Sequence, residues 1–169
     1  MTLQAVWQAV ADWPLAQYIA SSSWAFPTLE TIHVIAIVIV FGAIAIMDLR
    51  LLGLASTSSR VTEVSHDTLP WTWGAFGVAV ITGSLLFISK ATDYAVNPNF
   101  GWKMVLILAA GVNMAIFHVF TWRGVERWDS SRVAPLAAKL AGGLSLIIWI
   151  WAVFLARAIG FTLDLFSTT

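Results

Sequence analysis

The chain contains no cysteine, and this absence excludes several kinds of site. Disulfides, thiolate metal centres and the Cys-x-x-Cys-His motif for covalent haem attachment all require thiols. Any haem in this protein is therefore held non-covalently. Any metal ion takes nitrogen, oxygen or methionine sulfur ligands.

Charged residues are also scarce: they make up 11% of the 169 residues, and the nine basic and nine acidic side chains cancel. A soluble domain carries about 25% charged residues. Hydrophobic residues reach 59%, and the mean hydropathy is +0.84. This composition is typical of a membrane protein surrounded by a lipid bilayer. A net charge of zero gives no indication of a nucleic-acid partner, and we expect none.

The first ten residues lack the basic region and the long apolar core of a cleavable signal peptide. Instead, four apolar residues recur at the i, i+3, i+4, i+7 spacing of an amphipathic helix: Leu3, Val6, Trp7 and Val10. We expect a short interfacial helix over about 3–20, broken near Pro14. The alternative is a frayed N-terminal tail.

Four long apolar segments follow, and each is long enough to cross about 30 Å of hydrocarbon as a helix. They cover about 28–52, 69–89, 102–122 and 138–159. The connections are short, which makes sequential helices antiparallel neighbours. The sequence therefore predicts one all-α domain over 1–169, an integral membrane four-helix bundle.

The basic residues near the span ends predict the orientation of the bundle. Six lie on the side of the first and third loops: Arg50, Arg60, Arg123, Arg127, Arg132 and Lys139. The other side has Lys90, Lys103 and Arg157. The larger set is expected in the cytoplasm, with both termini outside. Asp48 and Arg50 then mark the cytoplasmic end of the first span.

Small residues form two stripes at i+4 spacing: Ala75, Ala79 and Gly83, and Ala137, Ala141 and Ser145. Such stripes let membrane helices approach closely, and these serve either the bundle interior or a homodimer face. Trp149 and Trp151 lie in the middle of the fourth span. They are expected to fill packing space or to form an aromatic wall beside a cofactor.

Two histidines, His33 and His118, fall inside the first and third spans. A buried imidazole in lipid is costly and indicates a partner or a function. In antiparallel spans the two rings should lie about 15–20 Å apart along the membrane normal. They are then too distant to ligate one iron together.

Each histidine therefore needs its own partner. His66 or Met47 is the candidate partner of His118, and Lys103 or Met104 is the candidate partner of His33. His/His and His/Met are ordinary axial pairs of b-type haem, while His/Lys is rarer. Four glycines can open space for a porphyrin: Gly42, Gly77, Gly83 and Gly111. Three cations can meet its propionates: Lys103, Arg50 and Arg123.

Simpler interpretations of these residues stay open. A histidine in a membrane helix can hydrogen-bond a neighbouring helix, and a lysine can extend to the interface. Glu30 and His33 form a Glu-x-x-His pair, half of the motif of carboxylate-bridged di-metal bundles. The missing second copy argues against a di-iron site but leaves a mononuclear copper or zinc site at these residues. We also expect Glu30 to pair with Lys103.

Two segments resemble small bacterial membrane proteins of the HemJ-like and CopD-like type. The segment from Leu29 to Leu54 reads LETIHVIAIVIVFGAIAIMDLRLLGL, with His33, Gly42 and Arg50 at matching places. The segment GWKMVLILAAGVNMAIFH resembles the later Trp-x-Lys…His span of those proteins. HemJ-like proteins bind b-type haem and oxidise protoporphyrinogen IX, and CopD-like proteins are associated with copper handling. The resemblance implies His33 as a haem ligand and Lys103 as a functional residue.

These observations predict a bacterial inner-membrane protein that binds one or two b-type haems. Its function would be membrane electron transfer or a haem-dependent oxidoreductase step, so whether it is an enzyme stays open. A quinone or a redox protein is the expected partner. The alternatives are a metal-handling protein without haem and a structural subunit without a cofactor. Hydrolytic and nucleotide-dependent functions have no supporting motif.

Overall fold

The computed structural model describes residues 2–131 and 133–166, and every regular element in this part of the chain is a helix. Two short helices come first, α1 (Leu3–Ala11) and α2 (Pro14–Ser21). The long helices are α3 (Ala25–Leu52), α4 (Val61–Ser89), α6 (Pro98–Ile116) and α7 (Leu136–Phe166). The short α5 (Ala91–Val96) precedes α6. A π-helical turn (Phe117–Thr121) and a 3-10 segment (Trp122–Arg127) continue α6.

Four of these helices are long and apolar enough to cross a membrane: α3, α4, α6 with its continuation to Arg127, and α7 as far as Leu163. Only 11–22% of the residues in their apolar windows are buried inside the protein. The remaining apolar side chains face outward, where lipid satisfies them and the backbone is hydrogen-bonded within each helix. The predicted fold class, an all-α membrane four-helix bundle, is confirmed.

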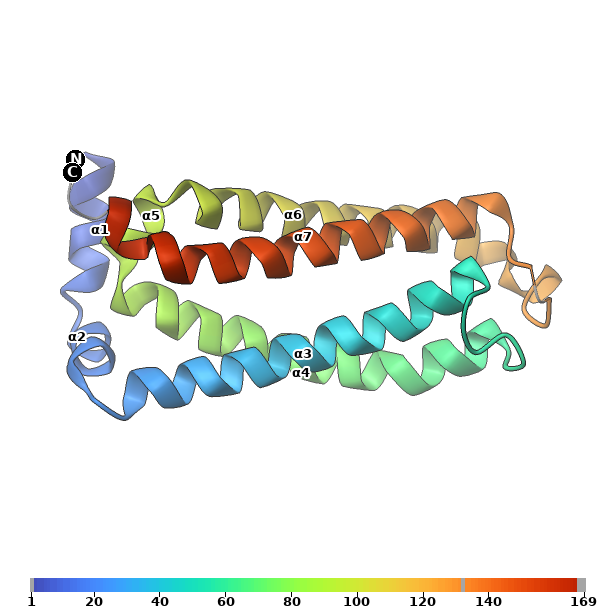
Figure 1. Ribbon diagram of the computed structural model, residues 1–169, viewed down its shortest axis with the longest axis horizontal. Coiled ribbons are helices and arrows are strands. Elements are labelled where there is room, and N and C mark those ends of the chain that lie inside the picture. The colour runs from blue at the N-terminus through green and yellow to red at the C-terminus, as the bar shows by residue number, and fades with distance from the viewer. Residues whose placement is uncertain (1, 132, 167–169) are drawn as a thin grey trace.

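The long helices pack in the order α4–α3–α7–α6, so α3 and α7 are central. Helices α3 and α7 lie close at the end that holds the α3–α4 loop, the compact end, and they diverge toward α1, α2 and α5, the diverging end (Figure 1). At the diverging end Phe87 of α4 stacks on Phe100 of α6. Of the three pairs of long helices that are adjacent in sequence, two pack against each other: α3 with α4, and α6 with α7. The exception is α4 and α6, which α5 separates and which share no extended contact.

The short helices α1 and α2 lie across the diverging end of the bundle, and the C-terminal part of α7 reaches the same end (Figure 1). The break between α1 and α2 falls at Asp12 and Trp13, and Pro14 occupies the first turn of α2. Proline suits that position because the first helical N–H groups have no acceptor within the helix. The predicted break near Pro14 is confirmed. Arg132, which we assigned to the opposite end, lies outside the described residues.

Helix α4 begins at Val61, eight residues before the predicted start of the second span. Asp129, in the loop before α7, caps it: its carboxylate accepts the Thr62 N–H and the Thr62 hydroxyl, both at 2.8 Å. The Glu63 carboxylate also accepts the Arg60 N–H at 3.0 Å. These acceptors satisfy the free N–H groups of the first turn, which hydropathy does not reveal. His66 therefore lies on a helix.

Helices α3 and α7 approach most closely at Gly142. A Cβ atom added there would stand 3.1 Å from the Asp48 carbonyl oxygen and 3.2 Å from the Leu51 Cβ. The predicted small-residue stripe of α7 lies only partly inside the bundle: Ala141 packs against buried residues and Ala137 is exposed, whereas Ala138, one position further along, is buried. This shift by one residue turns the contact face by about 100° around the helix.

The two tryptophans of α7 face opposite ways. Trp149 is buried and fills packing space, whereas Trp151 is 54% exposed on the outside of the bundle. The compact end of the bundle is closed by a hydrophobic cluster, whose buried members are Leu51, Val61, Phe117, Val125, Ala134 and Ala138. At the diverging end, polar and aromatic side chains lie between the helices, as described below.

Candidate functional site

His33 is held by a hydrogen bond from α3 to α4. Its Nδ1 atom lies 3.0 Å from the Thr82 hydroxyl oxygen, and that hydroxyl donates its own proton to the Val78 carbonyl oxygen at 2.7 Å. Because the hydroxyl proton is engaged, the hydrogen bonds assign a proton to Nδ1, which donates to Thr82. Nε2 then keeps its lone pair. Metal-ligating histidines are fixed in the same way, by a hydrogen bond from the other ring nitrogen.

Gly83 makes room for this ring. A Cβ atom at Gly83 would stand 2.9 Å from Cε1 and 3.4 Å from Nδ1 of His33. The stripe of α4 that contains Gly83 therefore serves the α3–α4 contact. Gly42, Gly77 and Gly111 have no neighbouring atom within 4 Å of an added Cβ, so close packing does not explain them.

Lys103 comes from the other helix pair, on α6. Its side chain is partly buried, and its ammonium lies 5.3 Å from the centre of the Phe100 ring. The ammonium is near enough to His33 to act on it electrostatically. The structure thus places Lys103 in the neighbourhood of His33, and their pairing at one iron stays a prediction. Met104, the alternative partner, is 48% exposed, because the next residue on a helix points about 100° away.

An aromatic cluster closes this region toward the short helices, and it consists of Trp7, Phe87, Tyr94 and Phe100. The Phe87 and Phe100 rings stack at 5.2 Å, Tyr94 lies 5.5 Å from Phe100, and Trp7 meets Phe87 edge-on at 5.6 Å. The cluster joins α1, α4, α5 and α6. The Lys103 ammonium lies over the Phe100 ring of this cluster, and a cation–π interaction holds the positive charge there.

Glu30 does not form the predicted ion pair with Lys103: no such pair occurs among the described side chains. Glu30 is exposed, and its charge acts on Tyr94. Burial raises the pKa of the Tyr94 phenol, and the carboxylates of Glu30 and Asp93 raise it further.

His118, at the opposite end, was expected to be buried but is exposed on the outside of the bundle. Its Nδ1 atom lies 2.9 Å from the Met114 carbonyl oxygen of its own helix. The ring packs beside Trp122, with ring centres 5.6 Å apart. Two causes turn it outward: α6 is an outer helix that packs on α7, and the chain around His118 forms a π-helical turn. The inserted residue of a π turn changes which side chains face the interior.

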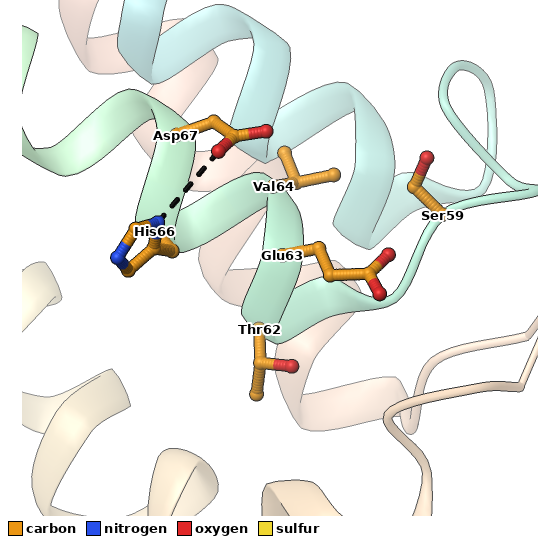
Figure 2. A pocket seen from close by; sticks show the side chains of 6 residues that line it. All are labelled: Ser59, Thr62, Glu63, Val64, His66 and Asp67. Carbon is orange, nitrogen blue, oxygen red and sulfur yellow. Dashed lines mark ion pairs between the residues drawn. The ribbon is translucent and has the colours of Figure 1, made fainter.

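His66 does not meet His118 either. Its side chain is 90% exposed, and its Nδ1 atom lies 3.7 Å from Oδ1 of Asp67. Figure 2 shows the two side chains together on α4, with Glu63 and Thr62 projecting from the preceding turn into an open surface pocket. Its position on the outer helix α4 places His66 far from α6, which has no extended contact with α4.

The remaining candidate ligands and propionate partners, Met47, Arg50 and Arg123, lie at the compact end. Met47 is half-buried and packs against the hydrophobic cluster of the compact end. Arg50 is fully buried and donates from Nε to the Ser59 carbonyl at 2.9 Å and from Nη2 to the Ser131 carbonyl at 3.1 Å. Its guanidinium thus ties the two loops of this end together. Arg123 is exposed and has no such role.

The two membrane histidines are even further apart than predicted. Leu51 and Phe117 share the hydrophobic cluster, so the level of His118 is close to that of Leu51. His33 precedes Leu51 by 18 residues of α3, which corresponds to roughly 27 Å along the helix axis. One iron cannot be ligated by both.

Three residues that hydropathy analysis overlooks shape the site and its supports. Thr82 orients His33, Asp129 caps α4, and Asn113 donates from Nδ2 to the Ala141 carbonyl at 3.0 Å, which joins α6 to α7. A polar residue within an apolar run is the signal that could have identified Thr82 and Asn113.

Comparison with protein-family models, with curated proteins and with solved structures finds no match to this chain. Within residues 2–131 and 133–166, no three side chains of histidine, aspartate or glutamate form a group that could hold a metal ion. The arrangement that the structure offers for chemistry is therefore one oriented imidazole, one lysine from the facing helix pair, and the aromatic cluster beside them.

Proposed function

We propose that this membrane protein binds a single b-type haem at His33 and serves electron transfer or a haem-dependent oxidoreductase step. The observation that supports the proposal most is the orientation of His33. Its Nδ1 lies 3.0 Å from the Thr82 hydroxyl oxygen on the neighbouring helix, and in the tautomer that carries its proton on Nδ1 the lone pair of Nε2 is available to a metal. A ligand held in this way needs no reorientation when iron binds.

The residues present fit such a group. His33 would supply the axial nitrogen, and Lys103 would supply either the second axial ligand or a cation for a propionate. Gly83 leaves space for the imidazole, and the aromatic cluster offers flat apolar surfaces. Bound haem would accept and release one electron at its iron. The protein's part is to hold the imidazole, to place a positive charge nearby and to exclude water.

One haem per chain is favoured over two. His118 and His66 face outward from different outer helices, and Met47 packs in the hydrophobic cluster. A second site would need ligands from another molecule. We therefore assign no haem to the compact end.

The experiment is the absorption spectrum of the detergent-purified protein before and after dithionite. We expect a Soret band and a reduced α band of the b type. His33→Ala should abolish both bands, and His118→Ala, the matched control, should keep full haem content. A wild-type protein without a Soret band would refute the proposal.

Metal analysis distinguishes the two alternative functions, metal handling without haem and a structural subunit without a cofactor. A colourless protein that carries copper or zinc, lost in His33→Ala or Glu30→Ala, would indicate the metal-handling function instead. A colourless protein without metal that co-purifies with another membrane protein would indicate a structural subunit.

The membrane placement is part of the same proposal. Five described basic residues lie at the compact end: Arg50, Arg60, Arg123, Arg127 and Lys139. By the positive-inside rule this end faces the cytoplasm of a bacterial inner membrane, and α1 and α2 lie in the outer headgroup layer. A quinone or redox protein would exchange electrons with the site, and a homodimer is compatible with the exposed apolar faces.

A further inference from the structure

Asp48 is a carboxyl group buried inside the membrane-spanning bundle. It lies on α3 where α7 approaches most closely, and it is 6% exposed. One of its oxygens, Oδ2, has no hydrogen-bond partner among the described residues. The hydroxyl of Ser145, one turn beyond Gly142 on α7, faces the carboxyl group. This contact between the two central helices is independent of the His33 site.

Among the described side chains, no cation forms an ion pair with Asp48. Arg50, two residues away, directs its guanidinium to the loop carbonyls of Ser59 and Ser131. Lys139 on α7 forms no ion pair within the described part of the chain, and Asn113 is the polar group that α6 contributes nearby. On α4, the charged groups near this level are His66 and Asp67, which are exposed on the other side.

A lone carboxylate in such surroundings is far more costly than the neutral acid. An ionised carboxylate there loses its hydration and gains only the Ser145 hydroxyl as a donor, whereas a protonated carboxyl needs no counter-charge and can itself donate one hydrogen bond. Ser145 offers an acceptor oxygen for that hydrogen bond. A metal ion would need several more oxygen ligands, and the described residues form no such group.

Asp48 lies close to the end of its helix. Asp48 precedes the end of α3 at Leu52 by four residues, or about 6 Å. Beyond it lie the buried Arg50 side chain, whose Nη1 has no partner among the described residues, and the carbonyl groups of the two loops.

We propose that Asp48 is a proton-binding site inside the bundle, with Ser145 as its hydrogen-bond partner, and that it exchanges its proton with the solvent of the compact end. The step is simple: the carboxylate takes a proton from water to give the neutral acid, and it returns that proton when it ionises. The protein thereby gains a group that can take up a positive charge inside the membrane without binding a metal.

Infrared spectroscopy of the protein in detergent or lipid tests the proposal. At neutral pH we expect the C=O stretching band of a protonated carboxyl group. The band should be lost in Asp48→Asn and kept in the control Asp67→Asn, whose carboxyl is 82% exposed. It should shift in D2O because the proton exchanges.

A second variant guards against misfolding of Asp48→Asn. Ser145→Ala removes the hydrogen-bond acceptor, and the band should move to higher frequency, a change that a purely structural role would not produce. Three results would overturn the proposal: no band in the wild-type protein at neutral pH, a band that persists in Asp48→Asn, or a band that disappears on addition of sodium at constant pH. The last result would indicate a cation site.

Discussion

A Cβ atom added at Gly83 would stand 2.9 Å from Cε1 of His33, closer than two carbon atoms can approach without repulsion. The two residues therefore share one packing position between α3 and α4. The imidazole occupies the space that any other side chain at position 83 would fill. This relationship connects the helix contact to the orientation of the candidate ligand, and the first prediction follows from it.

Gly83→Ala should displace the His33 ring and lower haem content, with little loss of helix stability. Alanine is the better helix former by about 1 kcal/mol, so a loss of haem would reflect the displaced ring. Haem content is measured by the Soret absorbance per protein. Gly77→Ala is the matched control, since an added Cβ at Gly77 meets nothing within 4 Å. Equal haem content in both variants would contradict the prediction.

Thr82→Val should weaken haem binding by about 10–100-fold, because it removes the oxygen that holds Nδ1 of His33. Thr82→Ser keeps the hydroxyl and should restore binding. Titration of the apoprotein with hemin measures the affinity of each variant. The control is Thr72→Val, at a threonine that bonds only its own helix, through the Thr68 carbonyl at 2.9 Å. A Thr82→Val protein with wild-type affinity would show that the hydrogen bond does not position the ring.

Arg50→Met should destabilise the compact end by about 2–3 kcal/mol, because it removes the hydrogen bonds that the buried guanidinium donates to the loop carbonyl groups of Ser59 and Ser131. Arg50→Lys should recover only part of the loss, since an ammonium cannot reach two loops with a planar fork. Thermal unfolding in detergent measures the effect. The exposed Arg123→Met is the control and should change stability by less than about 0.5 kcal/mol. An unchanged unfolding temperature for Arg50→Met would refute the structural role.

Asp129 should make stability depend on pH in the acid range. Desolvation raises the pKa of Asp129, but the hydrogen bonds from Thr62, the charge of Arg60 and the Val61 N–H outweigh it and lower the pKa overall. The stabilisation is therefore complete above the unfolded-state pKa of about 3.9 and is lost as the pH falls through the lower folded-state value. Asp129→Ala should unfold at lower temperature than wild type at pH 7.

The difference between wild type and Asp129→Ala should shrink as the pH falls below about 4. Unfolding temperatures at several pH values measure it, and Asp67→Asn serves as an exposed control. Amide exchange at Thr62 should also become faster in Asp129→Ala, since the N-terminus of α4 loses its cap. A constant difference across the acid range would show that the carboxylate charge is not involved.

Some properties follow from the sequence because they depend on local composition. The long apolar runs make four helices the only economical structures in lipid, since each helix satisfies its own backbone. Pro14 interrupts the N-terminal helix because it lacks an N–H group. The nearness of Lys103 to His33 was also predictable. Helix α4 runs back across the bundle between α3 and α6, so α3 and α6 both begin at the same end.

The direction in which each side chain points from its helix depended on contacts that the periodicity of the sequence does not reveal. His118 faces outward because α6 packs only on one side and contains a π turn. Arg50 binds backbone carbonyls because two loops, distant in sequence, converge on it. Hydropathy determines that a residue lies in a membrane helix. Only the packing of helices and loops determines whether its side chain meets lipid, a neighbouring backbone or a potential ligand, because that choice is made by atoms far away along the chain.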